Sequence, residues 1–372
     1  MTLTYSGEPV LMTGNQAAVE GAIAGGCLCF SGYPITPATE IAELMSIRMP
    51  EVGGTYIYAE SELAVINILT GAVAVGVLGM TATSGLGFSL MAEGMSNLAA
   101  MEFPTVVVNV CRGGPGSGSL GPSQSDYFQA TKGHGHGDYR VPVLAPWSPQ
   151  ETADDVAAGL ALADRYRTPV VILSDAVVAH AMEPVVIPDT VDAAAAPVRP
   201  WAITAGDSPK HHGGDDMPNV SGSGQGTTFE ALQQRLGSKY RQIRQNEVRF
   251  ESEGLDDDPR LVFVAFGSAA RAVSEARRTL SAQGVRTALI RPRTLWPFPG
   301  EAIRDALAAG DVPGLVVELS MGQFVEDVAA AAGHQTDLHL LAAPEARLVA
   351  PERIVDEAMQ ILTGSDHLVY ER

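Results

Sequence analysis

The stretch LGMTATSGLGFSLMAEGMSNLAAMEFPTVVVNVCRGG (Leu78–Gly114) decides the fold of this chain. Two apolar runs within it, Leu78–Thr83 and Thr105–Val110, have the length and composition of buried strands. Between them, Phe88–Ala100 carries apolar residues at helical spacing. A buried strand, a helix and a second buried strand in series predict a parallel sheet with helices packed on its faces.

The same alternation extends on both sides of this stretch. Before it, the sequence predicts a helix, a strand, a helix, a strand and a helix, at Gln16–Gly26, Cys27–Pro34, Ala38–Met49, Thr55–Tyr58 and from Ser61. After it come the strand Val141–Pro146, the helix Pro149–Tyr166 and the strand Pro169–Asp175. Residues 1–186 are therefore predicted to form a doubly wound, parallel α/β domain, whose ligands bind past the carboxyl ends of the strands.

A second α/β domain is predicted at residues 258–372. Its strands are expected at Leu261–Ser268, Val285–Pro292 and Gly314–Ser320, and its last helix at Pro351–Leu362. Residues 187–257 join the two domains, as a proline-rich and polar linker at 187–227 followed by a polar helix at Phe229–Asn246. That helix concentrates Arg and Lys, so it is either a solvated face or a docking face for an acidic partner.

Composition limits the class of protein. A length of 372 residues fits two or three domains, and 46% apolar against 18% charged residues excludes a disordered chain. Asp and Glu number 43 and Lys and Arg 24, for a formal net charge of −19. Because that charge repels phosphate and anionic lipid headgroups, we expect no nucleic-acid partner and no membrane surface.

Three further features indicate a cytoplasmic protein. The uncharged run Leu63–Ala92 is long enough to span a bilayer, but five glycines interrupt it, which favours buried elements in series. The N-terminus lacks a basic segment followed by an apolar one, so we expect no secretory signal. The three cysteines, Cys27, Cys29 and Cys111, form no C-x-x-C motif, so we expect neither an iron–sulfur cluster nor structural zinc here.

Several familiar motifs are present only in part. Gly116–Gly121 matches G-x-G-x-x-G, but prolines flank it and no apolar helix follows, so we expect a ligand-covering loop rather than an NAD site. Thr83–Gly85 lacks the first glycine of a nucleophile elbow. The histidines have no carboxylate-rich partner at ligand spacing and are expected to be structural or exposed: His134, His136, His211 and His212.

Polar residues follow four successive predicted strands, at Tyr33–Pro37, Glu60–Glu62, Thr81–Gly85 and Cys111–Pro115. Since the carboxyl ends of parallel strands share one edge, we expect these residues to meet there. Glu62 opens the uncharged run, so it is either a desolvated carboxyl suited to proton exchange or a carboxylate stabilised by a helix N-terminus. Arg112 is either a ligand-binding cation or a salt-bridge partner at the base of a loop.

These same residues carry a family resemblance. GYPITPATEIAE (Gly32–Glu43), AESELAVIN (Ala59–Asn67), MTATSGLGFSLMAEG (Met80–Gly94) and the glycine-rich stretch Arg112–Arg140 resemble the alpha subunit of 2-oxoacid:ferredoxin oxidoreductases, which are thiamine-diphosphate enzymes. The later segments KYRQIRQNEVRFE, LIRPRTLWPFP and VVELSMGQFVEDV are similar to the second domain of that family: Lys239–Glu251, Leu289–Pro299 and Val316–Val328. The resemblance covers nearly the whole chain apart from residues 187–227. It implies a thiamine-diphosphate-binding domain of the pyrimidine type, followed by a transketolase C-terminal-like domain.

The resemblance also implies roles for individual residues. Glu62 matches the glutamate that contacts N1′ of the cofactor's aminopyrimidine. Pro34 and Thr36 match residues that line the pocket around the thiazolium and the substrate carboxylate, and Ser84 is assigned to cofactor binding with them. Arg112 matches the arginine that pairs with the substrate carboxylate, for which a planar guanidinium is well suited. We therefore expect Glu62, Thr36 and Arg112 to be catalytic and no residue of this chain to bind a metal.

A partner is implied for the rest of the site. In the family, a beta subunit holds the diphosphate, Mg²⁺ and a [4Fe-4S] cluster, and this sequence lacks the G-D-G…Asn motif for the metal diphosphate. The resemblance implies a chain that is active only with its beta subunit, with coenzyme A as co-substrate and ferredoxin as electron acceptor. The family's fused gamma domain is not seen, so gamma and delta subunits are expected as separate chains or not at all.

The substrate is the least determined feature. The segments around Tyr33 and Thr81 are similar to subunits that act on 2-oxoglutarate, and Arg112–Arg140 to those that act on branched-chain 2-oxoacids such as 3-methyl-2-oxobutanoate. A second carboxylate needs a second cation, and residues 1–150 contain only Arg48, Arg112, Lys132 and Arg140. This shortage favours the branched-chain class over 2-oxoglutarate, and pyruvate stays an alternative substrate. A non-catalytic scaffold with the thiamine fold is the alternative of another class.

Overall fold

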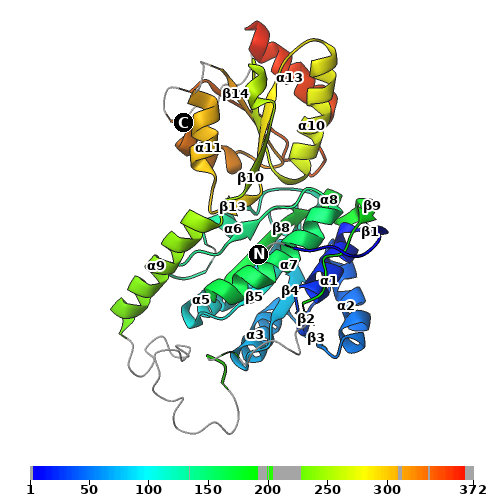
Figure 1. Cartoon of the computed structure of the whole chain (residues 1–372), viewed down its shortest axis with the longest axis vertical. Helices are drawn as coiled ribbons and strands as arrows, with labels where there is room; N and C mark the ends of the chain where they lie inside the picture. Colours follow the sequence, from blue (N-terminus) through cyan, green and yellow to red (C-terminus); the bar gives the residue numbers. More distant parts are fainter. Residues whose placement is uncertain are drawn as a thin grey trace.

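The computed structural model describes residues 3–133, 135–191, 199, 201–203, 228–308, 312–333 and 336–364. His134, His211, His212 and most of the predicted linker lie outside these residues. Figure 1 shows two α/β units stacked along the long axis of the molecule. We call residues 3–191 the N-terminal unit and residues 250–364 the C-terminal unit.

The N-terminal unit is built on a parallel sheet, as the sequence predicts. Its strand order is β13-β7-β8-β5-β4-β2-β3, and β6 pairs with β5 beside this path. The bounds are β2 Cys29–Gly32, β3 Thr55–Tyr58, β4 Gly79–Thr83, β5 Thr105–Gly113, β6 Ser119–Pro122, β7 Val143–Leu144, β8 Pro169–Asp175 and β13 Thr294–Trp296. The pairs among β2, β3, β4, β5, β7 and β8 are parallel, whereas β6 and β13 join antiparallel.

The helices of this unit fall into two contact groups, as a doubly wound sheet requires. One group holds α1 Gly14–Ala24, α2 Thr39–Glu51, α7 Pro149–Tyr166 and α8 Ala176–His180, and the other α3 Glu62–Ala74, α4 Leu86–Leu90 and α5 Ala92–Met101. Thr13 and Gln16 form a capping box that starts α1, and Ser148 caps α7. A small antiparallel ribbon joins β1 Val10–Thr13 to β9 Met182–Val185.

The helix predicted at Phe88–Ala100 is wrong in one respect, because it is divided between α4 and α5. The backbone N–H of Met91 is shared between the carbonyl oxygens of Gly87 and Phe88. This tightened turn ends α4, and α5 then starts at Ala92. The division places the short α4 at the end of β4, where the strand-end residues gather.

The C-terminal unit is a second α/β sheet of order β10-β12-β11-β14-β15. Its strands are β10 Phe250–Glu253, β11 Val262–Val264, β12 Ala288–Pro292, β14 Gly314–Glu318 and β15 Leu338–Ala342, and its helices α10 Gly267–Ala282, α11 Gly300–Ala308, α12 Phe324–Ala332 and α13 Pro351–Thr363. Only β10 is antiparallel to its neighbour. Directly after β12, the chain leaves this sheet and adds β13 to the edge of the N-terminal sheet.

Buried ion pairs fix the two units to each other. Arg291, at 1% exposure, donates to both carboxylate oxygens of Glu151 on α7, at 2.9 and 2.6 Å. Its guanidinium also lies 4.0 Å from the centre of the Trp147 ring. Arg293 pairs with the buried Asp155 at 2.9 Å. The segment LIRPRTLWPFP therefore supplies one strand to each sheet and also the arginines that hold the two units together. We call it the docking segment.

A second group of contacts joins the units near α12. Glu318 is fully buried, and its carboxylate accepts from the backbone N–H groups of Gln323, Phe324 and Val325, each at 3.0 Å. The side chain of Gln323 in turn bonds the N-terminal unit, where its oxygen accepts from the Phe128 N–H at 2.8 Å. The motif VVELSMGQFVEDV thus builds the start of a helix and presents it to α6, Tyr127–Thr131.

Two of the cations of the basic helix α9, Phe229–Asn246, are engaged within the chain, while Arg241 and Arg244 are exposed. Arg235 and Lys239 pair with the buried Glu102 at 2.7 and 2.5 Å, and Lys239 also donates to the Arg167 carbonyl at 2.9 Å. Burial lowers the pKa of Lys239 to about 8, although Glu102 opposes this shift. The helix therefore docks onto the N-terminal unit of its own chain.

Two smaller expectations can be compared with the structure. All three cysteines are buried free thiols, and burial raises the pKa of each, that of Cys27 to about 12, which disfavours the thiolate form. Among the described residues, no helix has both the length and the apolar character that crossing a bilayer requires. The run Leu63–Ala92 forms a helix and a strand, α3 and β4, as predicted, and the short helix α4 where a loop is expected.

Replacing Arg291 with Met should strongly destabilise the chain. The change leaves the Glu151 carboxylate buried without its main partner, which costs about 3–5 kcal/mol of the free energy of unfolding. Arg278→Met is the control, because Arg278 and Glu275 form an exposed pair worth about 0–1 kcal/mol. Urea unfolding of both variants measures the difference, and equal midpoints would contradict this account of the docking segment.

Candidate functional site

The turns after β2, β3, β4 and β5 meet at one edge of the N-terminal sheet. The strands pair in parallel register, with Gly32 beside Tyr58 and Thr83 beside Asn109, so β2, β3 and β4 end at nearly the same level and β5 continues past them to Gly113. All five residues assigned to the site from the sequence lie on or beside this edge. They are Pro34, Thr36, Glu62, Ser84 and Arg112.

Glu62 is the first residue of α3 and is only 4% exposed. The preceding Ser61 caps the helix, with its hydroxyl accepting from the Ala64 N–H at 3.3 Å. The carboxyl group lies against Gly87 of α4, since a Cβ atom added there would be 2.3 Å from Oε1 of Glu62 and 2.1 Å from Oγ1 of Thr83. Glu62 therefore starts a helix and is also buried, and its role in proton exchange stays a prediction.

Arg112 lies at the end of β5 and is partly exposed. Its Nη1 donates to the carbonyl oxygen of Thr36 at 3.1 Å, and no acidic side chain of the described residues is within salt-bridge distance of it. A Cβ atom added to Gly85 would be 3.8 Å from Cγ of Arg112, so the β4 turn packs on the arginine stem. The guanidinium is thus oriented by the β2 turn and still able to bind an anion.

Pro34 and Thr36 are exposed on the β2 turn, and Ser84 is fully buried. Thr36 contacts Arg112 through its own backbone carbonyl oxygen, which accepts a hydrogen bond from the guanidinium. Among the described residues, neither the Thr36 side chain nor Pro34 forms a hydrogen bond with the other site residues. The two residues therefore share the edge without being fixed to Glu62.

Several buried hydroxyl groups near this edge have no hydrogen-bond partner among the described residues. They belong to Ser31, Thr81, Thr83 and Ser84. Ser31 of β2 and Thr81 of β4 follow the paired residues Phe30 and Met80, so both hydroxyls lie on neighbouring strands. Buried polar atoms are almost always satisfied in native proteins, so a row of unsatisfied hydroxyls is what a polar ligand would leave when absent.

Sequence reasoning missed three residues of this site: Gly87, Asn109 and Asp126. Asn109 is fully buried in β5, where its amide nitrogen donates to Asp126 at 2.9 Å and its oxygen accepts from the Gly85 N–H at 3.2 Å. The signal was available, because Asn109 is the one amide within the otherwise largely apolar strand TVVVNV. A polar side chain in a buried strand needs hydrogen-bond partners, so such a residue is a candidate for a structural or functional role.

The glycine-rich loop is followed by a strand and not by the helix that a dinucleotide site needs. Residues Ser119–Pro122 form β6, which folds back antiparallel on β5, so no helix opens after the glycines. No group of three or more His, Cys, Asp or Glu residues able to hold a metal ion occurs in the described part of the chain. His136, the described member of the four histidines, is exposed.

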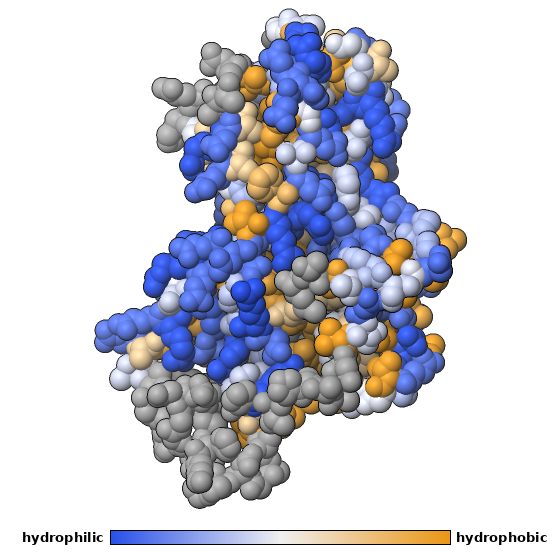
Figure 2. Space-filling view, in the orientation of Figure 1, coloured by the Kyte–Doolittle hydropathy of each residue, from blue (hydrophilic) through white to orange (hydrophobic). Residues whose placement is uncertain are grey.

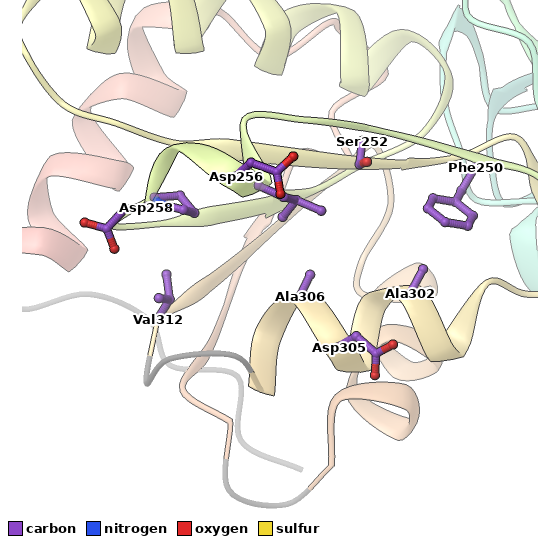
Figure 3. Close-up of a pocket in the computed structure, with 10 residues that line it drawn as sticks. Phe250, Ser252, Asp256, Asp258, Ala302, Asp305, Ala306 and Val312 are labelled. Carbon is purple, nitrogen blue, oxygen red and sulfur yellow. The ribbon is translucent and has the colours of Figure 1, made fainter.

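A separate cavity of about 580 Å³ lies in the C-terminal unit, between β10 and α11. Figure 3 shows its apolar side chains Phe250, Ala302, Ala306 and Val312 with three carboxylates around them. These acids, Asp256, Asp258 and Asp305, would repel an anionic substrate. The cavity contains none of the strand-end residues, so the sheet edge and not this cavity is the candidate site.

Comparison with known proteins identifies two matching family models. Residues 20–235 match the model described as pyruvate flavodoxin/ferredoxin oxidoreductase, thiamine-diphosphate-binding. Residues 260–354 match the model described as pyruvate:ferredoxin oxidoreductase core domain II.

Two curated relatives cover most of the chain. The ketoisovalerate oxidoreductase subunit VorB of Methanothermobacter thermautotrophicus is 44% identical over 329 residues, which are 87% of this chain and 90% of the relative. The 2-oxoglutarate synthase subunit KorA of Methanothermobacter marburgensis is 36% identical over 374 residues, 95% of this chain and 99% of the relative.

Two solved structures are similar in fold. The 2-oxoglutarate:ferredoxin oxidoreductase from Magnetococcus marinus, which has 2-oxoglutarate, coenzyme A and succinyl-CoA bound, matches with a TM-score of 0.80 and 30% identity. The match covers 95% of this chain but only 65% of that one. Transketolase from Leishmania mexicana matches with a TM-score of 0.52 at 15% identity, which concerns the fold alone.

Gly87→Ala should destabilise the chain although alanine is the better helix former. The new methyl group would overlap Glu62 and Thr83, and overpacking of this kind costs about 1–3 kcal/mol. Gly71→Ala in α3 is the matched control, because nothing lies within 4 Å of its Cβ position, and a gain of about 0.5–1 kcal/mol is expected. Urea unfolding of both variants measures the effects, and a Gly87→Ala chain as stable as wild type would show that the glycine does not hold the carboxyl group.

Proposed function

The chain belongs to the pyruvate flavodoxin/ferredoxin oxidoreductase family and is a subunit of a 2-oxoacid:ferredoxin oxidoreductase, and from this premise we propose that it is the alpha subunit, which supplies the pyrimidine side of a thiamine-diphosphate site. One observation carries the proposal: a buried carboxyl group, Glu62, shares a sheet edge with an available arginine, Arg112. A scaffold would need neither of them at that edge.

The residues of the edge fit the cofactor's aminopyrimidine. When bound, thiamine diphosphate supplies the electron sink for loss of CO₂ from a 2-oxoacid. Glu62 would hold a proton at N1′ of the pyrimidine, for which its protected position against Gly87 and Thr83 is suited. The unpartnered hydroxyls of Thr81 and Ser84 would bond the polar ring atoms.

Arg112 would bind the carboxylate that every 2-oxoacid carries. Its planar fork can donate two hydrogen bonds to one carboxylate, and the Thr36 carbonyl fixes the orientation of the guanidinium. Thr36 and Pro34 would line the pocket beside it. In this assignment, Glu62 and Arg112 act on different molecules, one on the cofactor and the other on the substrate.

The surface around this edge exposes apolar residues that suit the docking of a partner chain. Four large apolar residues are exposed around Glu62, namely Tyr58, Leu63, Leu86 and Leu90. Figure 2 shows further apolar residues gathered on the N-terminal unit, on the side that carries α2. Exposed apolar residues of this kind favour docking of the beta subunit. That subunit would hold the diphosphate, Mg²⁺ and the [4Fe-4S] cluster and would pass electrons to ferredoxin. Coenzyme A would take the acyl group.

For the substrate, we favour a branched-chain 2-oxoacid such as 3-methyl-2-oxobutanoate. The relative of highest identity above is named for ketoisovalerate. The other cations of residues 1–150 are engaged elsewhere, since Arg48 pairs with Glu20, Lys132 with Asp327, and Arg140 donates to a carbonyl. Residues 1–150 therefore offer no second unengaged cation for the distal carboxylate of 2-oxoglutarate, which is the alternative that the KorA relatives support.

Glu62→Gln should abolish turnover in the complex reconstituted with the beta subunit while leaving assembly intact. Glutamine can contact N1′ but cannot exchange the proton, so a loss of about 10²–10⁴-fold in kcat is expected. Glu60→Gln is the control, because Glu60 is exposed on the same turn. Acyl-CoA formation by the complex is the measurement. Wild-type activity for Glu62→Gln, or loss only with Glu60→Gln, would remove Glu62 from the mechanism, and a wild-type complex that binds no thiamine diphosphate would favour the scaffold.

Arg112→Lys should weaken all 2-oxoacid substrates alike. Lysine keeps the charge but loses the two-point geometry, which corresponds to roughly tenfold to a hundredfold in kcat/KM. The measurement is kcat/KM for pyruvate, 3-methyl-2-oxobutanoate and 2-oxoglutarate in wild type and variant. A loss confined to 2-oxoglutarate would mean that Arg112 binds the distal carboxylate, and it would reverse the preference for branched-chain substrates.

A further inference from the structure

The turn that touches both Glu62 and Arg112 has a backbone that needs support. Gly85 has φ 41° and ψ −93°, a conformation that residues with a side chain rarely adopt. Its N–H donates to the side-chain oxygen of Asn109 at 3.2 Å. The buried side-chain amide of Asn109 on β5 thus anchors the start of this turn by a hydrogen bond.

Asn109 is itself held by Asp126. The amide nitrogen of Asn109 donates to Oδ2 of Asp126 at 2.9 Å, which fixes the orientation of the amide and directs its oxygen to Gly85. Asp126 precedes α6 at the position where an aspartate ordinarily caps its own helix, yet it makes no such capping bond. Its carboxylate is committed to Asn109 instead.

The charge of Asp126 also faces the site. Burial raises the pKa of Asp126, while the Asn109 amide, the Cys111 thiol and the positive charge of Arg112 favour its ionised form. Asp126 is therefore near enough to Arg112 for the two charges to interact, without a direct salt bridge between them.

The supported turn contacts the proposed site on two sides. At Gly85 it packs against the stem of Arg112, and two residues later Gly87 lies against the carboxyl group of Glu62. A small displacement of the turn would move both groups away from productive geometry, and misplacement on the scale of 1 Å can cost about a hundredfold in rate.

We propose that Asn109 and Asp126 are positioning residues, which hold the turn Ser84–Gly87 against Glu62 and Arg112 and so set the geometry of the cofactor and substrate contacts. The inference rests on the proposed function for its catalytic consequence. Neither residue touches cofactor or substrate, and both act through the backbone of Gly85. The effect on the turn itself is independent of the reaction.

The test uses the complex with the beta subunit and four variants. Asn109→Ala removes both hydrogen bonds, Asp126→Ala removes one, and Asp126→Asn keeps an oxygen that can accept from Asn109. Thr131→Val is the matched control, because it removes a buried hydrogen bond in α6 that leads away from the edge, from Thr131 to the Tyr127 carbonyl at 2.7 Å. The readouts are amide hydrogen exchange of residues 84–90, deuterium exchange at C2 of bound thiamine diphosphate, and kcat/KM.

Asn109→Ala and Asp126→Ala should speed amide exchange of residues 84–90 and lower both C2 exchange and kcat/KM by about tenfold to a hundredfold. Asp126→Asn should recover most of the loss, and Thr131→Val should match wild type in all three readouts. Equal amide exchange in Asn109→Ala and wild type would overturn the inference, as would equal losses in Thr131→Val. If Glu62→Gln removes turnover and Asn109→Ala does not, the inference alone fails, whereas an inactive wild-type complex contradicts the proposed function.

Discussion

Parallel pairing of β2, β3, β4 and β5 forces the four turns that follow these strands to share one edge of the sheet. The functional residues are far apart in the chain, from Pro34 to Arg112, and only this register makes them neighbours. A shift of one strand by a single residue would turn Asn109 to the other face and release Gly85. The site therefore depends on the hydrogen-bond ladder of the sheet more than on any one of its side chains.

The C-terminal unit stabilises that sheet and reaches its edge at Ala346, which packs against Gly113 at the end of β5. Strand β13 extends the N-terminal sheet beside β7, and Arg291 neutralises the buried Glu151 at the start of α7. Gln124 and Leu319 exchange hydrogen bonds between the units near α6, the helix that follows Asp126. The position of Asp126 is thus set partly by the second unit, which links the interface to the supported turn.

Much of the fold follows from local sequence signals. The helix Pro149–Tyr166 and the strand Thr55–Tyr58 were predicted with their observed bounds, because Ser148 and Pro149 mark the helix start and the strand is bounded by glycine and polar residues. Strand β13 was not predicted, since three residues that leave one sheet for another carry no local pattern of their own. Glu62 and Arg112 could be assigned from motif and strand ends, whereas Gly87 could not, because its role depends on contacts across the turn. The roles of all five residues, Pro34, Thr36, Glu62, Ser84 and Arg112, stay predictions.

The central claim is that this chain provides one half of a thiamine-diphosphate site and a partner chain the other. An experimental structure of the complex with its beta subunit, thiamine diphosphate and Mg²⁺ tests it most directly. The account predicts the Glu62 carboxyl group within about 2.6–3.2 Å of N1′ of the pyrimidine, and the diphosphate and metal bound to residues of the partner subunit. A cofactor bound wholly within one chain, or a pyrimidine remote from Glu62, would contradict it.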